Sequence, residues 1–322
     1  MFSWFNQQKI VSKIQIGFVA VAFIMVTIVA ITIWQTKEVK SLSDKVVDLR
    51  VPTAQSSLEM LNGINHSLAA LRGWMILGKD KFKVERDNAW NEEITPALNK
   101  MQEFAKNWTN PQNVERLKII ESKLAEFKQF QKEIEDIANS KDNQPANKIL
   151  LIEAAPKAGI LLANITKMIN IEATQPATPE RKALLGIMAD VRGTTARSLA
   201  NIRAYLLSGN ANFKDSFDVM WTKNIKRFGD LTDQQALLTP EQLQLFKEFT
   251  SARTAFAPLP PKMFEIRGGE EWNIANRWLG TKAAPTAFAI KQQLDGMAAN
   301  QKQLLATDMA DSKARSDSLV TT

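Results

Sequence analysis

The sequence predicts an all-α protein, in which an N-terminal transmembrane helix precedes two stacked four-helix bundles built from a tandem repeat. Strand signals are scarce, because the 322 residues include one Tyr and almost no alternating β-branched runs. An uncharged apolar run occupies positions 14–34. The rest of the chain repeats itself in register. These three observations together favour a membrane-anchored helical protein.

The apolar run reads IQIGFVAVAFIMVTIVAITIW. At about 1.5 Å per residue, a helix of this length crosses a hydrocarbon core of about 30 Å. A cleaved signal peptide is the alternative, but its apolar region is shorter and ends in small residues, whereas this run ends in Ile-Trp-Gln. We expect an uncleaved anchor, with residues 1–13 in the cytoplasm and residues 36–322 outside the inner membrane.

The repeat begins in the region that follows the anchor. Residues 67–94 align without a gap on residues 198–225, at an offset of 131, and ten of the 28 positions are identical. After a two-residue deletion the match resumes at an offset of 129. The matched residues include Arg72 with Arg203, Gly78 with Gly209, Trp90 with Trp221, Asn147 with Asn276, and Ala154-Ala155-Pro156 with Ala283-Ala284-Pro285. Such a register indicates a tandem duplication, with repeats at about 60–175 and 191–305.

Each repeat predicts four helices, and its boundaries carry recognisable signals. Gly78 and Gly209 follow periodic helices, as a left-handed C-terminal glycine does. Thr178 and Thr239 each precede a Pro-Glu pair, which is typical of a helix start. The expected helices are 36–78, 80–107, 111–138, 146–174, 180–209, 211–236, 240–257 and 270–318, with weak points at 142–145 and 258–261. An amphipathic helix must bury its apolar stripe, so two repeats suggest two bundles.

Composition limits the possible functions. There is no Cys and a single His, His66, so we expect no metal site, cofactor or thiolate chemistry, and His66 is interpreted as structural. No phosphate-binding or nucleophile motif appears, so we expect no enzyme. The net charge of +7 suggests anionic partners or a membrane surface, or only a basic solvated surface. Because Lys and Arg are spread along the chain, nucleic acid is not expected as a partner.

The duplicated arginines are the sharpest candidate for a binding site. On a helical wheel Arg72 falls within the apolar stripe of its helix, and Arg203 and Arg192 fall on the equivalent stripe of the second repeat. A guanidinium in a bundle core needs an anionic partner. One interpretation is a small carboxylate bound between helices. The alternative is an internal ion pair with Asp87 or Asp218.

Four further residues could line such a pocket. Trp90 and Trp221 are either rigid pocket walls or core aromatics that close the bundles. Asn147 and Asn276 are either amide donors to a ligand or caps of the fourth helix. The sequence leaves both alternatives open.

The anchor, the duplication and the Arg-aromatic helix ends resemble a known family. The quoted ends are Leu71-Arg72-Gly73-Trp74-Met75-Ile76-Leu77-Gly78 and Ile202-Arg203-Ala204-Tyr205-Leu206-Leu207-Ser208-Gly209. They are similar to the helical bimodular sensor domain of bacterial methyl-accepting chemotaxis proteins and of some sensor histidine kinases. The resemblance covers the whole chain. It implies a periplasmic sensor region, two stacked four-helix bundles, homodimers, and organic acids bound in one or both bundles.

The resemblance also assigns residues. Arg72 matches an arginine of the membrane-proximal pocket, and Arg203 matches one of the distal pocket. Relatives that bind dicarboxylates carry a second arginine one turn earlier, where this chain has Ala69. A monocarboxylate, or a neutral or cationic ligand, is therefore also open.

We therefore expect the ligand-sensing part of a chemoreceptor, which signals to downstream proteins through a region beyond residue 322. The alternatives are the sensor region of a histidine kinase, or a membrane-anchored helical scaffold without a small-molecule ligand.

Overall fold

The structure, a computed structural model, describes residues 9–321 and their side chains up to residue 317. Most of the predicted cytoplasmic tail therefore lies outside the described residues. Within residues 9–321 the chain is helical and contains no strand. It divides into two compact units. Unit 1 comprises Met1–Gln129 and Ala283–Thr322, and unit 2 comprises Phe130–Lys282.

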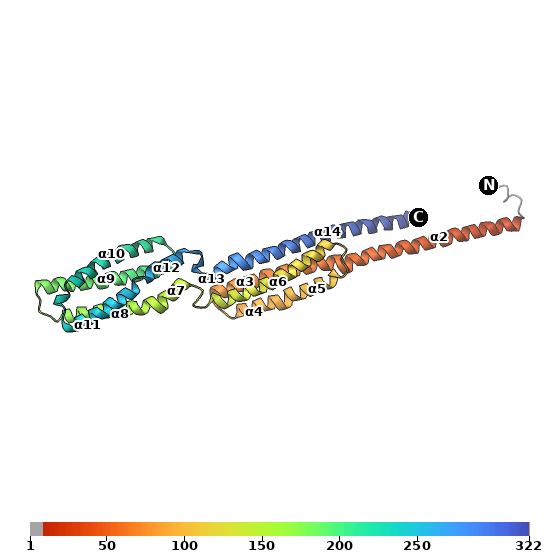
Figure 1. Cartoon of the computed structure of the whole chain (residues 1–322). Helices are drawn as coiled ribbons and strands as arrows, with labels where there is room; N and C mark the ends of the chain where they lie inside the picture. Colours follow the sequence, from red (N-terminus) through yellow and green to blue (C-terminus); the bar gives the residue numbers. More distant parts are fainter. Residues whose placement is uncertain (1–8, 322) are drawn as a thin grey trace. The chain divides into compact units, whose positions relative to one another are not determined.

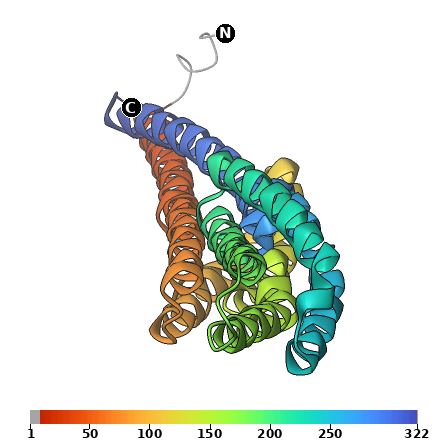
Figure 2. The same ribbon diagram turned by 90° about the vertical axis from the view of Figure 1, so that its left-hand side faces the viewer.

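Unit 1 is a bundle of four long helical rods. The first rod is continuous and runs through α2 (Ile10–Lys45), the π-helical turn η1 (Val46–Arg50) and α3 (Val51–Leu77). The second runs through α4 (Lys81–Asn88), η2 (Ala89–Ile94) and α5 (Thr95–Ala105). The third is α6 (Pro111–Ala138), whose last turns belong to unit 2, and the fourth is α14 (Ala284–Thr321). Helix α14 lies beside α2 and α3 (Figures 1 and 2).

Unit 2 is also built on four rods. They are α7 (Pro145–Ile149) continued by η3 (Leu150–Ala154) and α8 (Ala155–Glu172), then α9 (Pro179–Ser208), α10 (Ala211–Asp233), and α11 (Pro240–Phe256) followed by α12 (Leu259–Gly268). Short turns η4 (Gln235–Leu237) and η5 (Glu270–Trp272) join some of them, and α13 (Ile274–Trp278) with η6 (Leu279–Ala283) leads into α14. A continuous apolar core joins α8, α9, α10, α11 and α12.

The helix ends confirm the boundary signals in the sequence. Gly78 and Gly209 adopt φ of 59° and 71°, the left-handed conformation expected after a helix. Thr178 accepts a hydrogen bond from the backbone of Arg181, and Thr239 forms a capping box with Gln242. The chain between α11 and α12 breaks at residues 257–258, whereas most of the weak point predicted at 258–261 is helical. Helix α12 itself lies where no helix was predicted, and a loop precedes Pro145 as expected.

The duplication is organised by exchange of one helix. Unit 1 takes its first three rods from the first repeat and its fourth, α14, from the second repeat. Unit 2 takes α9, α10 and α11 from the second repeat and α8 from the first. A bundle is therefore not one repeat, although each repeat supplies four helices.

Proline explains where the rods widen into π-helical turns. Each π-turn in the described chain ends two residues before a proline, namely Pro52, Pro96, Pro156 and Pro285. Proline lacks an N–H and its ring clashes with the carbonyl four residues earlier. A π-turn, whose bonds span five residues as from Thr95 N–H to the carbonyl of Trp90, removes that clash. The second repeat agrees with this cause, because α10 has Arg227 opposite Pro96 at the offset of 131 and stays regular.

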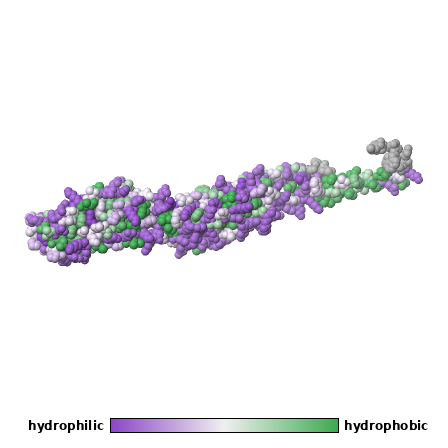
Figure 3. Space-filling view, viewed as in Figure 1, coloured by the Kyte–Doolittle hydropathy of each residue, from purple (hydrophilic) through white to green (hydrophobic). Residues whose placement is uncertain are grey.

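The N-terminal part of α2 is a candidate membrane span. Its apolar side chains, such as Phe18 and Phe23, are exposed. The rod is largely hydrophobic on the face seen in Figure 3. Among the described helices, Pro145–Glu172 is also long and apolar enough to cross a membrane. That helix buries Leu161, Ile165 and Met168 in the core of unit 2, which is the behaviour of a core helix.

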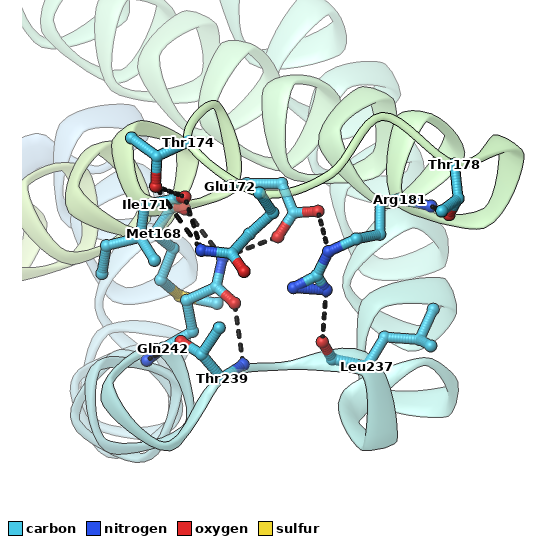
Figure 4. Close-up of polar contacts among 10 residues, drawn as sticks. Met168, Ile171, Glu172, Thr174, Thr178, Arg181, Leu237, Thr239 and Gln242 are labelled. Atoms are coloured by element: carbon cyan, nitrogen blue, oxygen red, sulfur yellow. Dashed lines mark hydrogen bonds and ion pairs between the residues drawn. The ribbon is translucent and has the colours of Figure 1, made fainter.

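The connection between α8 and α9 is tied to the start of α11 by buried polar groups (Figure 4). Gln242, which is fully buried, donates its amide to the Glu172 carboxylate at 2.8 Å and to the carbonyl of Met168 at 3.0 Å. Arg181 lies 3.4 Å from the same carboxylate and donates to the carbonyl of Leu237 at 2.9 Å. Three chain segments of unit 2 are thereby joined at one point.

Candidate functional site

The predicted inward orientation of Arg72 is wrong. Arg72 is exposed, whereas Met60, Ile64, Leu71 and Trp74 of the same helix are buried. The reason is a close approach at Gly63, where an added Cβ would lie 2.8 Å from Ile94 of η2. This contact turns the face that carries Gly63 and Ser67 toward the core and leaves Leu68 at its edge. A wheel centred on Leu68 therefore placed Arg72 too far inward.

The same correction applies to the second repeat. Arg203 is exposed beside the buried Ile202 and Tyr205, and Arg192 is exposed and donates to Thr166 of α8 at 2.9 Å. The alternative of internal ion pairs also fails, because Asp87 pairs with Arg86 at 3.1 Å. In the described part of the chain, no ion pair joins Arg72 or Arg203 to an acidic side chain.

Arg72 nevertheless lines a cavity of about 200 Å³ between α3 and α14 of unit 1. Leu61, Ile64 and Leu68 of α3 and Ala284, Ala287 and Phe288 of α14 form its apolar wall. Its polar groups are Arg72, Asn65 and Lys291. Lys291 lies 3.0 Å from Asp295, an exposed neighbour one turn along α14, so two cations and an amide face this cavity with one nearby carboxylate. The arrangement suits an anionic group with a small apolar body.

Lys291 is a site residue that the sequence did not indicate. Its counterpart in the first repeat is Leu162, and the counterpart of Phe288 is Gly159. The comparison between repeats therefore does not indicate a cation at this position. Lys291 comes near Arg72 because α14 of the second repeat packs against α3 of the first, which the sequence did not predict. For the same reason Arg203 has no cationic companion on α8 at the equivalent position.

The two tryptophans pack in or against the bundle cores. Trp90 is 6% exposed and packs on Phe127, with ring centroids 6.0 Å apart. Trp221 is partly buried and lies 5.9 Å from Phe217 and 5.7 Å from Phe256. The described contacts thus favour the interpretation of both rings as parts of a bundle core.

Trp221 also covers a cation that sequence reasoning missed. Arg253 of α11 is 8% exposed, with its guanidinium 4.5 Å from the Trp221 ring and 4.6 Å from the Phe228 ring. It donates to the side-chain oxygen of Asn224, whose amide in turn donates to Thr194 at 2.8 Å and to Thr195 at 3.0 Å. Burial lowers the pKa of Arg253 to about 10. Leu124 occupies the equivalent place in the first repeat, so the repeat comparison again gave no signal.

The two asparagines have local partners. Asn147 donates to the side chain of Gln144 and lines a surface cavity of about 420 Å³ beside the loop before α7. Asn276 is exposed, and its backbone N–H is capped by Asn273 at 3.0 Å. Asn273, and not Asn276, is therefore the N-cap of α13. Asn147 lies in unit 2 and does not line the cavity beside Arg72.

His66 has a structural partner. Its Nδ1 lies 2.6 Å from a carboxylate oxygen of Glu93, so it links α3 to η2. In the described chain no group of three or more His, Cys, Asp and Glu residues could hold a metal ion.

Comparison with known proteins identifies one family. The family model of a four helix bundle sensory module for signal transduction matches residues 7–183, just over half of the chain. No curated protein and no solved structure matches the chain.

Proposed function

The chain belongs to the family of four-helix-bundle sensory modules of methyl-accepting chemotaxis proteins, and from this premise we propose that it is the ligand-sensing part of a bacterial transmembrane chemoreceptor. The family is one of signal-transduction modules and not of enzymes. The duplication further supports the helical bimodular type, in which two bundles form one sensor. The sensor region would lie in the periplasm, anchored in the inner membrane by residues 14–34.

The proposed ligand is a small organic acid held between α3 and α14. The single observation that carries this proposal is the cavity lined by Arg72 and Lys291, two cations on different helices. A guanidinium binds a carboxylate through two parallel hydrogen bonds, and an ammonium adds a point charge. At about 200 Å³ the cavity is smaller than most drug-sized sites, which run from about 300 Å³ upward. A small acid with a short apolar body fits this description.

The position of the cavity connects binding to signalling. Helix α3 is continuous with the candidate span through Ile10–Leu77, and α14 packs beside α2. An acid that bridges Arg72 and Lys291 would favour one arrangement of these two helices over another. Only such a difference in affinity between two arrangements can drive a conformational change. In a homodimer, this change would reach downstream signalling proteins.

A thermal-shift screen of the chain against small organic acids tests this proposal. A true ligand at about 100 times its dissociation constant should add about 2.7 kcal/mol to the free energy of unfolding. The shift should disappear in Arg72→Ala and persist in Arg203→Ala, which removes the equivalent exposed arginine from unit 2. If no acid shifts the melting temperature, the scaffold interpretation gains. If Arg72→Ala binds as the parent does, the site is assigned wrongly.

A further inference from the structure

A second groove of unit 1 lies at the end nearer the candidate span. Its volume is about 700 Å³, and it lies between α2 with η1 on one side and the end of α5 with the following loop on the other. Arg50 and Thr109 line it together, 3.4 Å apart, and Arg50 is tied to Asp308 of α14 at 3.0 Å. Arg50 is 3% exposed and is paired with Asp308, and Glu103 of α5 is paired with Lys106 at 2.7 Å. The unpaired charges of the groove are therefore those of α2 and of η1, which continues it.

The unpaired charges of α2 and η1 in this groove follow an order along the rod. Lys37 and Lys40 come first, and Asp44 and Asp48 follow. All four side chains are exposed, and in the described part of the chain none of them forms an ion pair. Their spacing of three to four residues places them on one face of α2. Lys45 also lines the groove, about 100° around the helix from Asp44.

The position of the candidate span places these charges relative to the membrane surface. The apolar run ends at Trp34, and tryptophan prefers the headgroup level of a membrane. With a rise of about 1.5 Å per residue, Lys37 and Lys40 lie about 5 and 9 Å beyond Trp34, and Asp44 lies about 15 Å beyond it. The two lysines are therefore at the depth of lipid phosphates, and a carboxylate stands one turn farther from the hydrocarbon.

We propose that this face of α2 binds the headgroup of a zwitterionic phospholipid that carries a phosphate and a primary ammonium group, as phosphatidylethanolamine does. The phosphate contacts Lys37 and Lys40, and the ammonium donates hydrogen bonds to Asp44. The proposal rests on the proposed insertion of residues 14–34 in the membrane. It does not depend on the organic acid or on Arg72.

The order of the charges favours the phosphatidylethanolamine headgroup over those of other lipids. An anionic headgroup without a cation would satisfy Lys37 and Lys40 but would leave Asp44 facing negative charge. A choline headgroup carries a cation, but its methylated nitrogen has no N–H to donate to the carboxylate. Only a headgroup with both a phosphate and an N–H donor complements the sequence Lys, Lys, Asp along the helix.

The experiment measures lipid retention by the whole chain. The chain is reconstituted in bilayer discs that hold equal amounts of palmitoyl-oleoyl phosphatidylethanolamine, phosphatidylcholine and phosphatidylglycerol, and the lipids that remain bound on release into detergent are counted by native mass spectrometry. We expect phosphatidylethanolamine to be retained about fivefold over each of the other lipids, the factor that corresponds to one additional hydrogen bond, from its ammonium group to Asp44.

The decisive variant exchanges the order of the charges without changing their number. Lys40→Asp combined with Asp44→Lys should abolish the preference, while Lys9→Gln combined with Lys13→Gln, at the other end of the span, should keep it. Equal retention of the three lipids, a preference for phosphatidylglycerol, or a preference that survives the exchange would overturn the proposal. A shift of the melting temperature in detergent that is as large with soluble phosphoethanolamine as with phosphatidylethanolamine would also overturn it. Resistance of the chain to carbonate extraction confirms insertion separately, so failure of the anchor is distinguished from failure of the headgroup site.

Discussion

Among the described residues, no carboxylate pairs with the guanidinium of Arg253, and other groups compensate its charge. Two aromatic faces and the oxygen of Asn224 surround it, and Asn224 is itself fixed by Thr194 and Thr195. Each cation–π contact at a desolvated site contributes up to about 2 kcal/mol, which offsets part of the cost of burying the charge. The remaining cost appears as the lowered pKa of Arg253, about 10.

This environment predicts an effect of pH on the stability of unit 2. Burial makes the pKa of Arg253 lower in the folded chain than in the unfolded chain. Above about pH 10 the folded chain therefore loses this proton while the unfolded chain keeps it, and the free energy of unfolding rises with pH. Relative to Arg253→Leu, the parent should gain about 1 kcal/mol in unfolding free energy between pH 8 and pH 11. Urea unfolding of both proteins at the two pH values measures this difference. A difference that does not change with pH would contradict the assignment.

Glu172 is the acceptor that joins three segments of unit 2. Replacement by Gln removes the charge that faces Arg181 and sets an amide against the amide of Gln242. We expect Glu172→Gln to lower the free energy of unfolding by about 2 kcal/mol, since a buried donor is left unsatisfied. Urea unfolding gives the value, with Glu265→Gln, an exposed residue of the same unit, as the control expected within about 0.5 kcal/mol of the parent. Equal stability of the two variants would show that the contact contributes little.

At the scale of the element, each π-turn accommodates the proline that follows it. The extra residue of η3 exists because Pro156 cannot follow a regular turn. Deletion of Leu151, an exposed residue of η3, should therefore cost about 3 kcal/mol while Pro156 is present. The same deletion combined with Pro156→Ala should recover most of this loss, because a regular helix can then form. Circular dichroism with urea measures both variants, and equal losses would refute the coupling.

Most helices were predictable from sequence, but α12 and the π-helical turns were not. Caps and C-terminal glycines fixed most boundaries within a few residues, as at Thr239 and Gly209. Pro156 and Pro285 stand out in the sequence as matched positions of the repeat, and each lies two residues after the end of a π-turn. The orientation of Arg72 was predicted wrongly for a different reason. The close approach at Gly63 depends on a neighbouring helix, so the hydrophobic periodicity of the sequence does not reveal it.

At the scale of the whole molecule, the unit of folding is not the unit of duplication. The apolar core of unit 2 lies entirely within Phe130–Lys282 and includes α8 from the first repeat. A fragment of residues 130–282 should therefore unfold cooperatively in urea. A fragment of residues 60–175, which is one repeat, lacks α14 and should not. The opposite result, with a cooperative repeat and an unfolded unit, would contradict the helix exchange.

This exchange also limited the prediction of the site. The duplication predicted two related bundles and two related arginines, but the partners of those arginines belong to the other repeat. Lys291 thus joins Arg72 only through the pairing of α14 with α3, and Arg203 meets no equivalent cation. Repeat symmetry in sequence therefore overstated the symmetry of the two units.

The central claim is that an acid bound by Arg72 and Lys291 fixes α3 relative to α14, and a distance measurement tests it most directly. Because the chain has no Cys, spin labels can be placed by Asn62→Cys on α3 and Gln292→Cys on α14, both at exposed positions. Pulsed electron resonance on this labelled chain should show a shifted or narrower distance distribution when the acid found in the screen is added. No such change should occur when Arg72→Ala is also present. A distribution unchanged by saturating acid, or changed equally in the Arg72→Ala background, would contradict the account.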